Sequence, residues 1–309
     1  MNELKKLKAI DVHSHATFFP QYFPPYQTED NDPSWRLISA DDLIEIYDKL
    51  GVEKSVLLPI SGPEGQMSTL SNEQTKHLTV LHPDRFFWFC NVDPRNNQNT
   101  PKSDLVYLLN HYKKLGAKGV GEVTANMYVD DPKMEHFFDA CEQCDMPIMI
   151  HIAPVFDVDY GIYDDVGLPR IEKVLANHPN LKIIGHSQAF WAEVSGDLTK
   201  EKRGGYPTGP VVEGGTITRL MRKYPNLYCD LSAGSGSNAM MRDPEHAVRF
   251  FEEFSDRIMY GCDICTVHCE FTFEFREFLN KLLDDGKLSA ENYRKILRDN
   301  AIRILKLEL

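Results

Sequence analysis

The chain has 309 residues, 42% of them hydrophobic and 26% charged, which suits a folded globular protein of one α/β barrel or two smaller domains. Its 34 basic and 46 acidic residues give a formal charge of −12, which argues against a broad nucleic-acid or membrane-surface footprint. No apolar run is long enough to span a bilayer, and we expect no export signal in the charged start MNELKKLKAID.

Short apolar runs, many of them β-branched, alternate with longer amphipathic segments along the whole chain. Eight runs are predicted strands: 8–13, 54–60, 86–92, 117–123, 147–153, 181–187, 226–232 and 258–263. Predicted helices lie between the strands, and one closes the chain: 39–51, 71–83, 102–116, 132–144, 168–179, 214–225, 244–255 and 289–307. Several of these helices end at a glycine, or at a proline just beyond.

This alternation predicts a parallel sheet closed into a (β/α)8 TIM barrel, regular or distorted, that forms a single domain over residues 1–309. The alternative is an open doubly wound sheet, which would usually carry a glycine-rich phosphate loop after its first strand. Two long loops, at 17–36 and 190–214, follow the first and sixth predicted strands. Barrel enzymes build their sites at this end, so we expect a lid or substrate wall, with ordinary surface insertions as the alternative.

The first predicted strand runs into two histidines, His13 and His15. Side chains alternate along a strand, so the two imidazoles point the same way and can form half of a metal site. A short motif of this kind also occurs by chance. Four further imidazole or carboxylate groups lie at the ends of other predicted strands: Glu122, His151, His186 and Asp263. Each alone could be a core or capping residue, but chance explains poorly why all six fall at equivalent strand ends.

The residue types in this set suit one chemistry. Neutral imidazole and carboxylate are ligands for Zn²⁺ and for neighbouring divalent transition metals. A catalytic ion keeps one position open for water, whose pKa it lowers to roughly 7. A nearby carboxylate can ligate the ion and also take the proton of that water. The set therefore predicts a metal-dependent enzyme.

Five motifs carry a resemblance to a known family. They are D-V-H-S-H at 11–15, I-H at 150–151, G-H-S at 185–187, G-C-D at 261–263 and N-A-x-R at 300–303. In this order they resemble the amidohydrolase superfamily of metal-dependent TIM-barrel enzymes, over nearly the whole chain. The most similar branch is the amidohydrolase-related one, which includes hydrolases, hydratases and non-oxidative decarboxylases of aromatic or unsaturated acids.

The resemblance implies a ligand set for the primary metal: His13, His15, His151 and Asp263. Asp263 would also be the catalytic base, and His186 would be either a second-metal ligand or a catalytic residue that polarises the substrate. Many two-metal members carry a carboxylated lysine on strand four, where this chain has Glu122. Glu122 resembles the bridging glutamate of other branches; a structural ion pair with Arg or Lys is the alternative.

Our leading expectation is a hydrolase that acts on a small organic substrate through a metal-activated water. The alternative is a lyase at the same site, a non-oxidative decarboxylase of an aromatic or unsaturated carboxylic acid. A barrel that only binds a ligand is disfavoured, because none of the expected metal ligands is missing. Zn²⁺ is the favoured cofactor, with Mn²⁺, Fe²⁺ or Ni²⁺ as alternatives and with one or two ions per chain.

Candidate substrate contacts are weaker, because polar surface residues and packed aromatic residues are the common case. Four residues are candidates: Ser187, Tyr128, Trp191 and Arg170. The seven cysteines, an odd number, predict free thiols and a cytoplasmic location. A small-molecule substrate is the expected partner, with no nucleic acid and no membrane, and homo-oligomer formation stays open.

Overall fold

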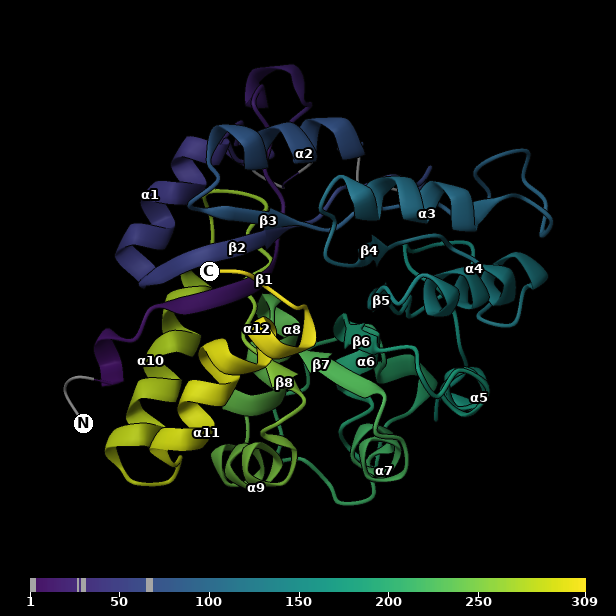
Figure 1. The fold of residues 1–309 in the computed structure, drawn as a ribbon. Coiled ribbons are helices and arrows are strands. Elements are labelled where there is room, and N and C mark those ends of the chain that lie inside the picture. The colour runs from purple at the N-terminus through teal and green to yellow at the C-terminus, as the bar shows by residue number, and fades with distance from the viewer. Residues whose placement is uncertain (1–3, 27, 29–31, 65–68) are drawn as a thin grey trace.

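The structure is a computed structural model that describes residues 4–26, 28, 32–64 and 69–309. Helices surround a ring of short strands, and each predicted strand overlaps one observed strand (Figure 1). The strands are β1 (Ala9–Ser14), β2 (Val52–Leu57), β3 (Phe86–Trp88), β4 (Val120–Val123), β5 (Ile148–His151), β6 (Ile183–His186), β7 (Leu227–Asp230) and β8 (Ile258–Met259).

All strand pairs are parallel, in the orders β1-β2-β3 and β4-β5-β6-β7-β8. A parallel bridge between Cys90 and Val120 carries the order from the third strand to the fourth. A second bridge, between Ser14 and Ile264, returns it from the eighth strand to the first. The arrangement confirms the predicted TIM barrel. The barrel is irregular, since β8 has two residues and β1 and β4 each contain a register shift.

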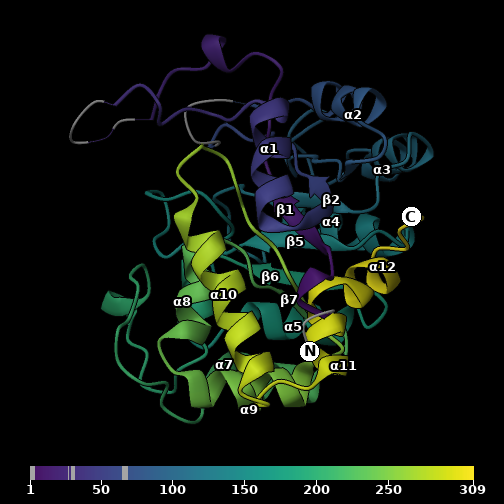
Figure 2. The same cartoon turned by 90° about the vertical axis from the view of Figure 1, so that its left-hand side faces the viewer.

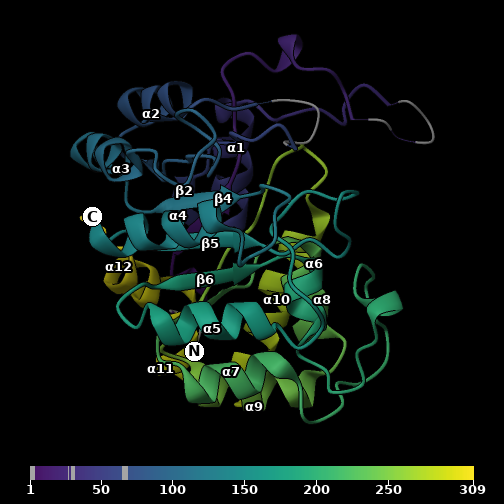
Figure 3. The ribbon, with the colours of Figure 1, turned by 90° about the vertical axis from the view of Figure 1, so that its right-hand side faces the viewer.

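The helices cover the outside of the ring, as the views from two opposite sides show (Figures 2 and 3). Their bounds are α1 (Ala40–Leu50), α2 (Asn72–Leu81), α3 (Leu105–Lys114), α4 (Pro132–Gln143), α5 (Pro169–Asn177), α6 (Gln188–Ala192), α7 (Thr216–Lys223), α8 (Ala233–Met241), α9 (Pro244–Phe254), α10 (Glu270–Asp284), α11 (Ala290–Arg294) and α12 (Asn300–Ile304). A π-helix, Lys295–Asp299, joins the last two. Within the described residues, no helix is both long and apolar enough to cross a membrane.

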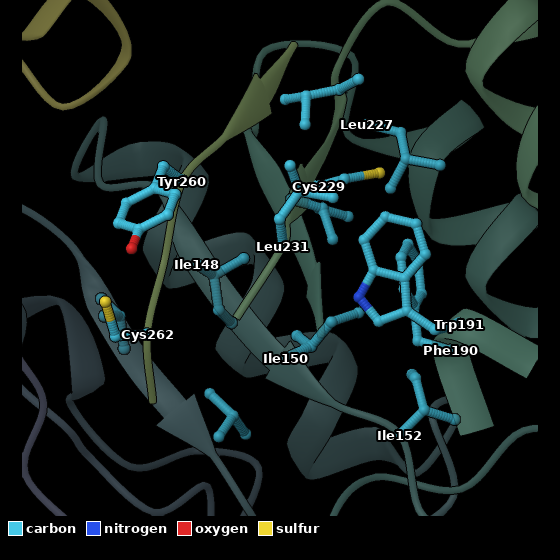
Figure 4. Packing of buried hydrophobic residues seen from close by; sticks show 14 of the residues in the cluster. Ile148, Ile150, Ile152, Phe190, Trp191, Leu227, Cys229, Leu231, Tyr260 and Cys262 are labelled. Carbon is cyan, nitrogen blue, oxygen red and sulfur yellow. The ribbon is translucent and has the colours of Figure 1, made fainter. Parts of the chain in front are cut away.

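Alternation along the strands separates two apolar clusters. On β5, Ile148 and Ile150 belong to the larger cluster between strands and helices, together with Trp191 (Figure 4). Met149 lies in the smaller cluster, which also contains Ile304 of the last helix. Because side chains two apart share a face, the strand that buries Met149 turns its last residue, a histidine, toward the barrel interior.

The described part of the segment between β1 and α1 extends beyond the barrel body (Figure 2). Residues 27 and 29–31 of this predicted loop lie outside the described residues. The predicted loop at 190–214 begins inside α6 and contains a short 3₁₀ helix, Lys200–Lys202. Both loops leave carboxyl ends of strands, which places them beside the cluster described next.

Candidate metal centre

Six side chains meet at the carboxyl ends of the strands, and they are the six that the sequence predicts: His13, His15, Glu122, His151, His186 and Asp263. Five are buried, and the sixth, Asp263, has a side chain that is 22% exposed. The structure therefore brings the whole predicted set to one place.

A register shift in β1 places the first two histidines. The shift lies between Asp11 and Ser14, where Ser14 Oγ turns back and donates to Asp11 Oδ2 at 2.7 Å. His13 and His15 then share a side, and their Nε2 atoms are 3.1 Å apart. Asp11 also accepts the hydroxyl of Tyr47 on α1, so the strand end is tied to the helix outside it.

Glu122 lies between two pairs of histidines. Its Oε2 atom is 3.5 Å from His13 Nε2 and 3.6 Å from His15 Nε2. Its Oε1 atom is 2.5 Å from His151 Nδ1 and 3.6 Å from His186 Nε2. Each carboxylate oxygen thus faces a different pair of ring nitrogens, the arrangement in which one carboxylate can bridge two cations.

Asp263 faces the same atoms from the other side. Its Oδ1 atom is 3.4 Å from both His13 Nε2 and His15 Nε2, and its Oδ2 atom is 3.7 Å from His186 Nε2. Three overlapping groups each place three ligand atoms within 4.8 Å of one another: His13, His15 and Glu122; His13, His186 and Asp263; Glu122, His151 and His186. His151, which the resemblance assigns to the primary metal, is grouped here with Glu122 and His186.

The carboxylates of the cluster favour positive charge on His13 and His15. Burial opposes a charge on His13, but the carboxylates of Asp263 and Asp230 outweigh burial and raise its pKa well above the ordinary value. The pKa of His15 likewise rises to about 9, against burial, through its hydrogen bonds with Asp263 and Glu122. Burial alone would raise the pKa of Glu122, yet the neighbouring imidazoles hold it well below the ordinary value.

The donor set fits a divalent transition metal. The carboxylate of Glu122 makes its ion-pair contacts with four histidines, and no lysine or arginine is among the described residues that contact it. Neutral imidazoles and carboxylates are the ligands of Zn²⁺ and of neighbouring divalent transition metals. A bound cation would neutralise the carboxylate charge that protonated imidazoles balance in its absence. Among the described residues, Glu122 therefore has no ion pair with Arg or Lys, which was the alternative role for this carboxylate.

Outer contacts fix the rings of the first two histidines. His13 Nδ1 lies 2.8 Å from Asp230 Oδ2, and His15 Nδ1 lies 2.8 Å from the carbonyl oxygen of Leu58. In both rings Nε2 is left facing the centre. Such outer partners orient metal-ligating imidazoles and fix their tautomer.

A cavity of about 650 Å³ opens on the cluster, and His151, His186 and Asp263 form part of its wall. Its aromatic lining comes from both long loops and two other segments: Tyr26, Trp35, Tyr160, Tyr206 and Phe271. The Trp35 ring stacks on His268, with centroids 4.2 Å apart and planes at 12°. The part of the wall that the structure describes contains no lysine or arginine.

The four predicted substrate contacts lie elsewhere. Trp191 is buried in the core and donates from Nε1 to the carbonyl oxygen of Asp230. Ser187 is also buried, and its Oγ bonds to the backbone of Ile152.

Arg170 pairs with three carboxylates, those of the exposed Asp130 and Asp165 and of the buried Asp164. The Tyr128 ring packs on Phe156 and lies under the Arg170 guanidinium. None of the four is among the described residues of the cavity wall.

A TIM barrel with an imidazole–carboxylate cluster at the carboxyl ends of its strands defines the class of metal-dependent barrel proteins. The amidohydrolase family model matches residues 10–307, and the chain belongs to that family. A search of curated protein sequences finds no match.

Solved structures of the same fold include proteins of different activities. An uncharacterized TIM-barrel protein from Bordetella bronchiseptica has 18% identity and a TM-score of 0.65, over 97% of this chain and 99% of that one. A 5-carboxyvanillate decarboxylase from Novosphingobium aromaticivorans, complexed with manganese and 4-hydroxy-3-methoxy-5-nitrobenzoic acid, has 15% identity and a TM-score of 0.63, over 98% and 97%. A probable 2-pyrone-4,6-dicarboxylic acid hydrolase from Acinetobacter baumannii has 15% identity and a TM-score of 0.55, over 97% and 100%.

Proposed function

We propose that the protein is a metal-dependent hydrolase of a small organic substrate, with a centre for two divalent ions. The observation that carries the proposal is the position of Glu122, whose two oxygens face separate histidine pairs. His13 and His15 would hold one ion with Asp263, and His151 and His186 would hold the other. Zn²⁺ fits this donor set, and Mn²⁺, Fe²⁺ and Ni²⁺ are alternatives.

The residues of the chain divide the catalytic work. A bound divalent ion supplies Lewis-acid chemistry, because it polarises a substrate carbonyl and acidifies water. Asp263 lines the cavity and is the more exposed of the two central carboxylates, so we assign it the proton of the attacking water. The Glu122 side chain is only 7% exposed, and it would help to hold both ions. The aromatic wall excludes water from the rest of the substrate.

A second candidate is a non-oxidative decarboxylase at the same centre. Two observations favour it: the wall is rich in aromatic rings, and a neighbour of the same fold is a decarboxylase with a substituted benzoic acid bound. With no cationic side chain on the described wall, the metal centre would be the group that receives the substrate carboxylate. A panel of esters, lactones, amides and hydroxybenzoates separates the two reactions. Hydrolysis supports the first candidate, whereas CO₂ release without hydrolysis supports the second.

Elemental analysis tests the centre itself. We expect two divalent ions per chain in the wild type and fewer in His15→Ala and in Asp263→Asn, because each change removes a ligand atom from the cluster. Lys281→Ala, at an exposed helical ion pair, is the control and should keep the full complement. A full complement in both cluster variants would overturn the assignment of the ligands.

A further inference from the structure

Asp230 at the end of β7 is fully buried and contacts two of the candidate ligands. Its Oδ2 atom lies 2.8 Å from Nδ1 of His13 and 3.0 Å from Nδ1 of His186. Ser232 adds a second route, because its hydroxyl donates to Asp230 Oδ2 at 2.5 Å and its Oγ lies 3.0 Å from His186 Nδ1. The two histidines come from β1 and β6, so one carboxylate reaches both halves of the cluster.

We propose that Asp230 is a positioning residue that fixes His13 and His186 together in the tautomer that leaves Nε2 free for a metal ion. The inference rests on the proposed function, since it concerns the same centre. A neutral imidazole carries one N–H, and an ionised carboxylate can only accept. An imidazole whose Nδ1 faces Asp230 therefore donates from Nδ1 and keeps its lone pair at Nε2. The Ser232 hydroxyl hydrogen is committed to Asp230, so Ser232 Oγ also accepts from His186.

The carboxylate of Asp230 is itself held on several sides. Oδ1 accepts the backbone N–H of Ser232 at 2.9 Å, and the Asp230 carbonyl oxygen accepts Trp191 Nε1 at 3.0 Å. The backbone of Gly261 closes the remaining side, because a Cβ there would lie 2.2 Å from Asp230 Oδ1. This contact explains why the G-C-D motif begins with a glycine. Gly261, two residues before Asp263, has no side chain and so leaves room for Asp230.

The other two histidines are oriented by different groups. His15 faces the carbonyl oxygen of Leu58, and His151 turns Nδ1 to Glu122 in the centre. Asp230 thus differs in contacting two imidazoles, His13 and His186, that the proposed function assigns to different ions. Removing one ligand should lower the affinity for the ion that it binds, whereas substituting Asp230 should lower the affinity for both ions.

Zinc titration of the metal-free protein compares the wild type with Asp230→Asn. An asparagine must turn its NH₂ group either toward the imidazoles or toward the Ser232 N–H, and both are donors. We expect the affinity for both ions to fall about 10- to 100-fold, the usual effect of losing an outer partner. The matched control is Asp164→Asn, at a buried aspartate that accepts the first N–H groups of α5 and lies outside the cluster. It should keep the wild-type affinity.

The ¹⁵N NMR signals of the histidines provide a readout that a general loss of stability would not produce. In the zinc-loaded wild type, His13 and His186 should show protonated Nδ1 and metal-shifted Nε2, with both rings assigned from His→Gln variants. Asp230→Asn should change both rings. If it does not fold, Gly261→Ala displaces the same carboxylate and keeps its charge.

Unchanged affinity and unchanged ring signals in a folded variant would overturn the inference and leave the proposed function standing. A wild type that binds no zinc would instead overturn the proposed function. In that case, ¹⁵N NMR of the metal-free protein at alkaline pH tests the role of Asp230 on the neutral rings of His13 and His186. Protonated Nδ1 on both rings supports the positioning role, and protonated Nε2 overturns it.

Discussion

Glu122 is fixed through its backbone as well as through its carboxylate. The Asn91 side-chain amide donates to the carbonyl oxygen of Glu122 at 2.5 Å and to that of Pro59 at 3.0 Å. Asn72 Oδ1 in turn accepts the backbone N–H of Asn91 at 2.8 Å. The buried amide of Asn91, which follows β3, thus joins the chain after β2 to β4 and fixes the backbone from which the Glu122 carboxylate extends.

Gly161 fixes the position of His151 through a close backbone contact, and substituting this single residue tests that role. A Cβ at Gly161 would lie 2.7 Å from both Cδ2 and the carbonyl oxygen of His151, and the residue has a φ of +111°. We expect Gly161→Ala to displace the ring and to lower, about tenfold or more, the affinity for the ion that His151 and His186 are proposed to hold. Zinc titration measures the change.

Gly167→Ala is the matched control. Gly167 also has a positive φ, +90°, but its Cβ position has no neighbour within 4 Å. Both variants carry backbone strain, and only the first carries the steric clash. Equal losses of zinc in the two variants would contradict the role given to Gly161.

At this scale the sequence predicts the ligands better than the substrate wall. The six cluster residues follow strands whose ends are fixed by the barrel, so their convergence could be predicted. Tyr160 and Trp35 lie in loops whose paths depend on tertiary packing, and no local periodicity points to them. Trp191 is the opposite case. It follows the G-H-S motif, which predicts a substrate contact, yet it is buried in the core.

At the scale of elements, neighbouring helices are joined by polar contacts outside the barrel. The Glu172 carboxylate on α5 accepts hydrogen bonds from Lys223 Nζ at 2.8 Å and from Arg219 Nη1 at 2.7 Å, both on α7. It also accepts one from the Tyr224 hydroxyl at 3.2 Å. The hydrogen bond from Lys223 contributes most to lowering the pKa of Glu172, which falls from 4.5 to about 2. Because the side chain is 22% exposed, solvent screening limits what the pair contributes.

Glu172→Gln should therefore lower the free energy of unfolding by about 1 kcal/mol at pH 7. The folded-state pKa lies below the unfolded value, so this stabilisation is present above pH 4.5 and is lost as the pH falls toward 2. Urea denaturation of both proteins at pH 7, 5 and 3.5 measures the difference. Glu291→Gln, which removes one exposed i,i+4 pair, is the control and should have a smaller effect. A difference that grows on acidification would contradict the assignment.

Two helices show why some elements could not be predicted. Helix α8 has the sequence AGSGSNAMM, whose glycines and serines have low helix propensity, and it forms because tertiary packing overrides that preference. Helix α10 begins with Phe271, Phe273 and Phe275, whose period of two is typical of a strand. Its helical period becomes clear only from Phe275 to Leu279 and Leu282, which are buried.

At the scale of the molecule, the first and last strands of the barrel meet at the candidate metal centre. Val12 N donates to the carbonyl oxygen of Tyr260 at 3.2 Å, and Asp263 N donates to that of His13 at 2.6 Å. Candidate ligands from β1 and from the segment after β8 lie on either side of this seam. The chain order of the strands predicts the seam, whereas its closeness to the ligands follows from the short β8 and the turn at Asp263, where φ is +53°.

An ion bound across this seam should stabilise the whole barrel, because it binds the folded state and finds no preformed site in the unfolded chain. At a hundredfold excess of free Zn²⁺ over Kd, a single site contributes about 2.7 kcal/mol, which corresponds to an increase in Tm of roughly 4 °C for a chain of 309 residues. Thermal unfolding of the chelator-treated protein, with and without added Zn²⁺, measures the shift. Mg²⁺ should not reproduce it, because Mg²⁺ prefers oxygen ligands and retains its waters. Glu122→Gln removes the carboxylate between the two histidine pairs and should abolish most of the increase in Tm. An increase in Tm equal to that of the wild type would place the stabilising ion elsewhere.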